Sequence, residues 1–261
     1  MDKESCLLFS PSHFTWMDTN YPAGTPRQGY PIEIQALWFA SLSFLAEKTC
    51  RVRWAKLALQ VKESIETLFK LHGRTWLADC LHCDPNIPAA KAIPDDHLRP
   101  NQLFAITLGA IDSFEMREGI LAACSALLVP GAIRTLADVD VQFQLPVISA
   151  DKKLLNNPSR PYFGRYEGNE DTRRKPAYHN GTAWTWPFPS FCEAWYITYG
   201  NLGRDTAKAL LASSKVVLDE GCVGHSPEIL DGDYPNLQRG CDAQAWGISE
   251  LLRVWQLLHR K

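Results

Sequence analysis

The chain has 261 residues, of which 46% are hydrophobic and 21% are charged, proportions of a globular protein that can bury a core. Lysine and arginine number 27 against 29 aspartate and glutamate residues, a net charge of -2 that argues against non-specific binding of nucleic acid or anionic membranes and favours a neutral ligand. No apolar run approaches the roughly 18 residues that span a bilayer, and the first residues are polar, so we expect a soluble, cytoplasmic protein.

Helical periodicity dominates the chain. In residues 33–48, for example, Leu37, Trp38 and Leu45 recur at helical spacing. The predicted helices cover residues 33–48, 52–71, 101–108, 115–129, 182–199, 204–218 and 242–258. The one strand-like segment is 75–81. About seven helices and one short strand predict an all-α fold.

Long connections separate these helices and are rich in proline, glycine, asparagine and charged residues. They span residues 19–31, 84–100, 145–181 and 221–240. Connections this long inside a compact protein usually have a function. Their tryptophan, tyrosine and histidine content argues against disorder, so we look for the site in these segments.

Eight cysteines at irregular spacing do not form the pattern of a disulfide scaffold. Cys80 and Cys83 make a C-x-x-C pair around His82, but a tetrahedral zinc site needs four ligands and no second pair lies nearby. We therefore expect reduced, packed thiols and no metal.

Asp18 is a candidate general acid. Hydrolysis of a glycosidic bond needs one carboxylic acid that protonates the leaving oxygen and one carboxylate that activates water or attacks carbon. Asp18 follows Trp16 and Met17 at the mouth of a loop, where these neighbours would desolvate the carboxyl and raise its pKa. The alternative role, common for aspartate near glycine and proline, is to cap a turn.

Glu228 is the candidate partner of Asp18. It lies in the loop before the last predicted helix, which can present it at one end of that helix. The alternative is an exposed glutamate without a partner. Asp231-Gly232-Asp233 lacks the further ligands of a calcium loop and is interpreted as a turn or as a pair of hydroxyl-binding carboxylates.

Aromatic and amide side chains in the same loops suit a sugar. The chain has nine tryptophans, and a flat indole ring with one N–H donor matches a sugar face and its hydroxyls. His179 leads into Trp184 and Trp186, with Thr182 as a candidate helix cap, and Arg99 lies beside two amide residues. The alternatives are core packing for the tryptophans and helix capping for the polar residues.

An ordered series of motifs resembles the central signature of glycogen debranching enzymes, the amylo-α-1,6-glucosidase family. The series begins with Thr15-Trp16-Met17-Asp18, Thr25-Pro26-Arg27 and Pro31-Ile32-Glu33-Ile34-Gln35-Ala36-Leu37-Trp38, and continues with Arg99-Pro100-Asn101-Gln102, Tyr178-His179, Trp184, Trp186, Gly221-Cys222, Glu228-Ile229, Asp231-Gly232-Asp233 and Gln244-Ala245-Trp246. The resemblance covers nearly the whole chain from about Phe14 onward.

The resemblance implies an (α/α)6 toroid and an inverting enzyme that releases glucose from α-1,6 branch points of glycogen or limit dextrin. Asp18 matches the general acid and Glu228 the general base, with carboxyl groups expected about 6.5–9.5 Å apart. Expected to bind the branched α-glucan or oligosaccharide are Trp16, Arg27, Glu33, Trp38, Arg99, Asn101, Gln102, His179, Trp184 and Trp186. No cofactor is expected.

The match departs from the family at its start, because only 14 residues precede Thr15, whereas the family has several helices before this motif. Residues 1–261 are therefore expected to be the C-terminal part of a single catalytic domain. Part of a closed ring of helices would form an open arc, and its uncovered apolar edge would favour self-association. Two alternatives stay open: an α/α-toroid glycosidase acting on trehalose, mannosides or short glucosides, and a non-catalytic glucan-binding fragment.

Overall fold

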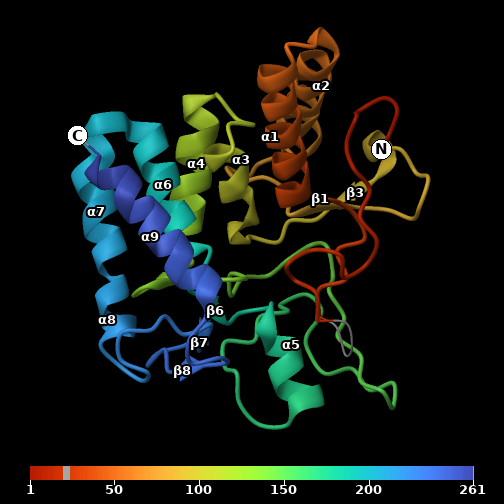
Figure 1. Ribbon diagram of the computed structural model, residues 1–261. Helices are drawn as coiled ribbons and strands as arrows, with labels where there is room; N and C mark the ends of the chain where they lie inside the picture. Colours follow the sequence, from red (N-terminus) through yellow and green to blue (C-terminus); the bar gives the residue numbers. More distant parts are fainter. Residues whose placement is uncertain (20–23, 261) are drawn as a thin grey trace.

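The computed structural model describes residues 1–19 and 24–260 (Figure 1). Residues 20–23 of the predicted loop 19–31 lie outside the described residues. Helices make up most of the secondary structure. They are α1 (Ile32–Thr49), α2 (Val52–Leu68), α3 (Leu103–Thr107), α4 (Phe114–Ser125), α5 (Lys175–Tyr178), α6 (Phe188–Tyr199), α7 (Arg204–Ala212), α8 (Ser214–Leu218) and α9 (Ala245–His259). The short helical turns are η1 (Ala89–Lys91), η2 (Pro100–Gln102), η3 (Glu170–Arg174) and η4 (Gly200–Gly203).

All seven predicted helices are confirmed, with shifted ends. α6 begins at Phe188 rather than at residue 182, because Ala183 and Trp184 form a strand and Pro187 precedes the helix. The predicted helix 204–218 is divided into α7 and α8 at Ser213. The ends of a helix are harder to predict from sequence than its presence, because short turns and strands define them.

The fold is mainly helical but it is not all-α, because two small antiparallel sheets are present. One sheet has the order β1 (Gly29–Pro31), β2 (Cys80–His82), β3 (Ile93–Pro94). The other has the order β4 (Leu128–Val129), β5 (Ala132–Arg134), β6 (Ala183–Trp184), β7 (Ile229–Leu230), β8 (Gln238–Arg239). Strands of two or three residues are too short to show alternation in a sequence, so only the segment near β2 was predicted.

The main helices follow one another in an open series (Figure 1). α2 packs on α1, α1 on α3, α3 on α6, and α6 on α4, α7 and α9. Side chains such as Ile65, Leu103, Ile120, Phe191 and Leu258 fill the core between them. A fully buried apolar side chain of this size contributes about 1.5–3 kcal/mol, so the shared core holds the series together.

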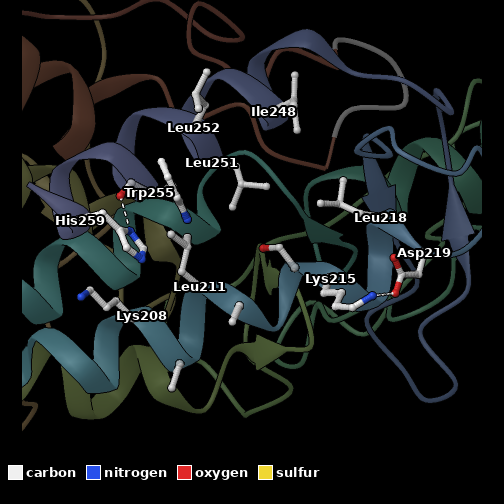
Figure 2. A pocket seen from close by; sticks show the side chains of 13 residues that line it. Lys208, Leu211, Lys215, Leu218, Asp219, Ile248, Leu251, Leu252, Trp255 and His259 are labelled. Atoms are coloured by element: carbon white, nitrogen blue, oxygen red, sulfur yellow. Dashed lines mark hydrogen bonds and ion pairs between the residues drawn. The ribbon is translucent and has the colours of Figure 1, made fainter.

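An apolar groove of about 700 Å³ lies at the α9 end of this series, between α7–α8 and α9 (Figure 2). Leu211, Leu218, Leu251, Leu252 and Trp255 line it. Leu252 and Trp255 remain 54% and 51% exposed, so the face is only partly covered by the described chain.

The two sheets join loops that are far apart in the sequence. In the larger sheet Trp184 pairs with Ile229, which sets residue 228 beside Thr185, and the Thr185 N–H donates to the Glu228 carbonyl. In the smaller sheet β1 pairs with β2, and the Ile32 N–H donates to the Asp79 carbonyl. Among the residues that the structure describes, no helix has both the length and the apolar character for a membrane span.

Candidate active site

Glu228 is held by three hydrogen-bond donors immediately before β7. Its carboxylate accepts from the Tyr178 hydroxyl at 2.5 Å, from the Cys241 N–H at 3.0 Å and from the Gln244 side-chain amide at 3.3 Å. Its own N–H donates to the Cys241 carbonyl at 2.8 Å. The alternative of a glutamate without partners is therefore wrong. A half-buried carboxylate with this many donors keeps one orientation.

Tyr178, the last residue of α5, holds the Glu228 carboxylate, and both candidate carboxylates affect its pKa. Burial raises the pKa of its hydroxyl far above the ordinary value, and the hydrogen bond to Glu228 raises it further, so the hydroxyl stays a donor. The negative charges of Glu228 and of Asp18 both raise the pKa of this hydroxyl as well. The Trp184 ring contacts both Tyr178 at 4.8 Å and Trp16 at 5.2 Å, so the segments that carry Asp18 and Glu228, 210 residues apart in the sequence, meet at this cluster.

Asp18 ends a short segment that is anchored to the protein interior. The Trp16 indole N–H donates to Asn101 Oδ1 at 2.8 Å, and Thr15 Oγ1 accepts from both the Met17 N–H and an Arg27 guanidinium N–H at 3.1 Å. Met17 is fully buried, whereas Asp18 is exposed. The expectation that Trp16 and Met17 would desolvate this carboxyl is therefore wrong, because both side chains turn inward and leave the carboxyl at the surface.

Aromatic rings gather beside this segment. The Trp16 ring makes edge contacts with His179, Trp184 and Trp186 at centroid distances of 5.3, 5.2 and 5.0 Å. Trp246, which was not among the expected site residues, stacks on Trp186 at 4.9 Å. Within residues 1–19 and 24–260 the indole N–H groups of Trp186 and Trp246 have no acceptor. Both N–H groups are buried inside the cluster.

His179 lies inside the aromatic cluster, stacked on Trp184 at 5.2 Å. Both ring nitrogens are buried and lack a partner in the described part of the chain. Burial lowers its pKa well below the ordinary value, and the nearby Arg99 and Arg27 charges lower it further. The imidazole is therefore neutral at physiological pH.

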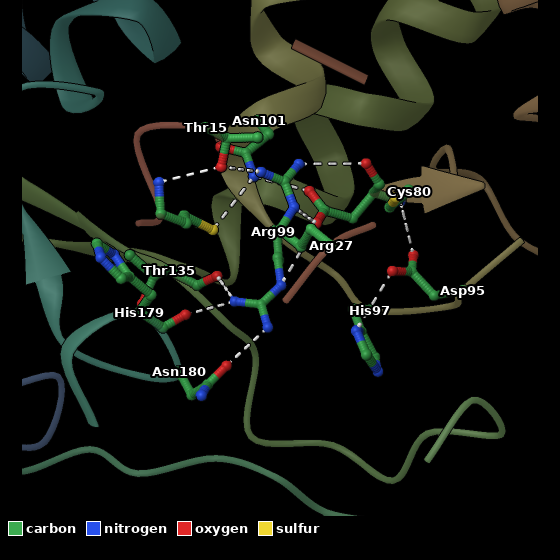
Figure 3. Close-up of polar contacts among 12 residues, drawn as sticks. Thr15, Arg27, Cys80, Asp95, His97, Arg99, Asn101, Thr135, His179 and Asn180 are labelled. Carbon is green, nitrogen blue, oxygen red and sulfur yellow. Dashed lines mark hydrogen bonds and ion pairs between the residues drawn. The ribbon is translucent and has the colours of Figure 1, made fainter. Parts of the chain in front are cut away.

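The expected polar binding residues belong to a buried network, and Figure 3 shows Arg27, Arg99 and Asn101 in it. Arg27, Glu33, Arg99, Asn101 and Gln102 are each less than 5% exposed. Arg27 makes a bidentate pair with Glu33 at 2.5 and 2.6 Å, and Gln102 donates to the Arg99 carbonyl at 3.0 Å. Their donors and acceptors are directed at the protein, which is the arrangement of a scaffold for the site.

Asp79 is the member of this network that sequence reasoning missed. Its carboxylate accepts from Arg27 Nε at 2.6 Å and from Asn101 Nδ2 at 2.7 Å. The only signal in the sequence is a charged residue inside the apolar segment 75–81, and a charge in such a position is rarely buried unless it is paired.

Several other predicted features lie outside the cluster. Trp38 lies on α1, and its indole N–H donates to the Cys6 carbonyl at 3.2 Å. Cys80 is a buried thiol directed at the Gln28 carbonyl. In the described part of the chain, no group of three histidine, cysteine, aspartate or glutamate side chains is placed to hold a metal ion. Asp231 is fully buried and paired with Arg239 at 3.0 Å, which favours the turn interpretation for this residue.

Comparison with known proteins agrees with the resemblance. A family model described as amylo-alpha-1,6-glucosidase matches residues 1–253. A solved structure described as a sialidase superposes with a TM-score of 0.63 at 10% identity, covering 96% of this chain and 21% of that one, so the likeness concerns the fold alone and this chain spans about a fifth of that structure. No curated protein matches in sequence. Because the family model covers nearly all of the sequence, the chain belongs to the amylo-α-1,6-glucosidase family, a glucosidase-type family of glycoside hydrolases.

Proposed function

We propose that the chain hydrolyses α-1,6-glucosidic bonds and releases glucose from branch points of glycogen or limit dextrin with inversion at the anomeric carbon. The observation that carries the proposal is the arrangement around Tyr178, whose hydroxyl donates to Glu228 and whose ring contacts Trp184, which also contacts Trp16, two residues before Asp18. Family membership supports the glucosidase chemistry.

In the proposed reaction Asp18 is the general acid and Glu228 is the general base. Asp18 gives its proton to the glycosidic oxygen as the bond from this oxygen to the anomeric carbon breaks. Glu228 takes a proton from a water molecule whose oxygen bonds to the opposite face of that carbon. We expect the two carboxyl groups about 6.5–9.5 Å apart, the separation that leaves room for this water.

The aromatic cluster supplies the proposed contacts to the glucose ring. Trp16 and Trp246 are partly exposed and are the proposed stacking surfaces, whereas the Trp186 ring stacks on both Phe104 at 5.3 Å and Trp246 at 4.9 Å. Stacking on an indole ring stabilises a neutral sugar without any charge. The buried residues behind them would act through the position of Trp16 rather than by touching the sugar.

We further propose that residues 1–261 form the C-terminal part of a single (α/α)6 catalytic domain. The open series of helices from α2 to α9 and the family match through residue 253 support this organisation.

Glucose release from a branched limit dextrin tests the proposed function. The chain is incubated with limit dextrin and, separately, with trehalose, a mannoside and a linear α-1,4-glucoside. We expect glucose from the limit dextrin, appearing first as the β-anomer in a proton NMR time course, and a release slowed on the order of 10²–10⁴-fold with Glu228→Gln. Release from another sugar only, or binding of glucan without any release, would contradict the proposal.

A further inference from the structure

We propose that Asp79 is a positioning residue that fixes the segment of Asp18 and the segment of Glu228 relative to one another. The proposal rests on the proposed function, because it gives these two carboxylates catalytic roles. Asp79 does not touch the substrate: its side chain is 2% exposed and lies behind Asn101 and Arg27.

The first arm of the Asp79 network reaches the acid segment, residues 15–18, which ends in Asp18. Asp79 Oδ2 accepts from Arg27 Nε at 2.6 Å, and Arg27 Nη1 donates to Thr15 Oγ1 at 3.1 Å. Asp79 Oδ1 accepts from Asn101 Nδ2 at 2.7 Å, and Asn101 Oδ1 accepts from the Trp16 indole at 2.8 Å. Each path has one residue between Asp79 and the acid segment, and both end within three residues of Asp18.

The second arm reaches the segment that carries Tyr178. Asp79 Oδ2 lies 3.6 Å from Arg99 Nε. Arg99 donates to the His179 carbonyl at 2.5 Å and to Asn180 Oδ1 at 2.7 Å (Figure 3). These two residues directly follow Tyr178, whose hydroxyl holds Glu228.

The negative charge of Asp79 is what joins the two arms. Both guanidinium groups are buried, and Glu33 is already engaged in the bidentate pair with Arg27, so Asp79 is the carboxylate that the two arginines share. Burial lowers the pKa of Arg99 to about 10, and the charge of Asp79 opposes that fall. An asparagine at this position would remove the charge, and in either orientation its NH2 would face a donor, Arg27 Nε or Asn101 Nδ2.

Two indole groups report on the two arms independently of activity. Trp16 lies two residues before Asp18, and its indole N–H donates to Asn101. The Trp184 indole N–H donates at 2.8 Å to the carbonyl of Tyr178, the residue whose hydroxyl holds Glu228. Their proton and nitrogen resonances can be assigned with Trp16→Phe and Trp184→Phe. A change in either hydrogen bond then appears as a change of chemical shift.

Asp79→Asn is the test and Asp95→Asn is the matched control. Asp95 is a fully buried carboxylate that pairs with His82 at 2.8 Å, and its Oδ1 accepts from the Asp79 N–H, which an amide oxygen can still do. We expect Asp79→Asn to shift both indole resonances and to lower kcat about 10- to 100-fold, with KM changed less than about threefold, because misplacement of the catalytic groups costs this much. Asp95→Asn should lower the melting temperature and leave both resonances and kcat near wild type.

A second variant covers the case in which Asp79→Asn does not fold. Thr15→Val removes the hydroxyl that accepts from Arg27 and from the Met17 N–H without changing a buried charge, and it should shift the Trp16 resonance and lower kcat in the same way. Unchanged resonances and kcat in Asp79→Asn, or in Thr15→Val where the former does not fold, would overturn the proposal. A wild-type chain that releases no glucose would refute the proposed function instead, and the two indole resonances would still decide whether Asp79 holds both segments.

Discussion

Glu228 and Asp18 are held in different ways, and the difference fits their proposed roles. Glu228 receives three hydrogen bonds and keeps one orientation, as a base that must align a water molecule requires. Asp18 stands exposed at the end of a segment whose preceding residues are anchored. An acid that must be reprotonated after each turnover benefits from this contact with solvent.

Asp18→Asn and Glu228→Gln should each lower the rate of glucose release on the order of 10²–10⁴-fold, the usual contribution of a positioned acid or base. The melting temperature should stay close to wild type, since neither carboxyl belongs to the apolar core. Glucose assays and thermal melting of the purified variants check both points. Wild-type turnover in either variant would remove that residue from the mechanism.

Acid should destabilise the protein through its buried histidines. Burial lowers the pKa of His179 and of His97 below the ordinary value of 6.5, so below that pH the unfolded chain binds protons that the folded chain does not. The contribution of these neutral histidines to the free energy of unfolding is complete above about pH 6.5. It is lost as the pH falls toward the folded-state pKa values, by up to about 1.4 kcal/mol per pH unit for each histidine.

Urea denaturation between pH 5 and pH 8 measures this dependence. His179→Phe, which keeps a flat ring against Trp184, should reduce the slope between pH 6.5 and pH 5. An unfolding free energy that rises on acidification, or an unchanged slope in the variant, would show that His179 is not held neutral.

At the scale of elements, the site depends on a short helical segment. η3 (Glu170–Arg174) and α5 (Lys175–Tyr178) together carry Tyr178, and their first turn is capped by Asn169, whose Oδ1 accepts from the Asp171 and Thr172 N–H groups at 3.1 Å. By contrast, α4 is capped by Ser113, which accepts from the Met116 N–H at 3.2 Å. The two caps have similar chemistry, but only the first belongs to an element that bears a site residue.

Asn169→Ala and Ser113→Ala therefore form a matched pair. Loss of either cap should cost about 1 kcal/mol. Ser113→Ala should lower the unfolding free energy and leave the specific activity unchanged. Asn169→Ala should lower the specific activity severalfold, because fraying of the turn releases the Tyr178 hydroxyl from Glu228. Equal specific activities in the two variants, measured on folded protein, would contradict this role for η3–α5.

At the scale of the whole molecule, the series of helices ends in two apolar faces. One is the groove between α7–α8 and α9 (Figure 2). The other is on the α1–α2 pair at the far end of the series, where Leu37, Phe44 and Leu59 are 52%, 58% and 57% exposed. Apolar faces of this kind favour association, so we expect the chain to self-associate through the groove.

Leu252→Glu should weaken this association. A charge in the groove would be buried without a partner in the complex, so we expect a shift toward monomer in analytical ultracentrifugation and no loss of melting temperature for the isolated fold. Leu202→Glu, at a 96% exposed leucine on η4, is the control and should leave the association unchanged. Wild-type protein that stays monomeric over the whole concentration range would refute the proposed contact.

The helices and the order of the motifs could be predicted from local sequence patterns. Each of the seven helices has a local apolar period, which neighbouring residues alone can produce, and the motifs around Asp18 and Glu228 are contiguous stretches. Family membership followed from the same stretches. The boundaries of α6 and the division between α7 and α8 were not predicted, because they depend on a strand and a turn of only a few residues.

Which side chains face the site could not be predicted in this way, because it depends on contacts between distant segments. Arg27, Arg99 and Asn101 resemble sugar-binding residues by type, but pairing between distant segments buries them in a network around Asp79. The exposure of Asp18 follows likewise from partners that bury the residues before it, among them Asn101, which lies 85 residues from Trp16. Burial and charge pairing are long-range properties, because the atoms that exclude water or neutralise a charge come from segments that the local pattern does not contain.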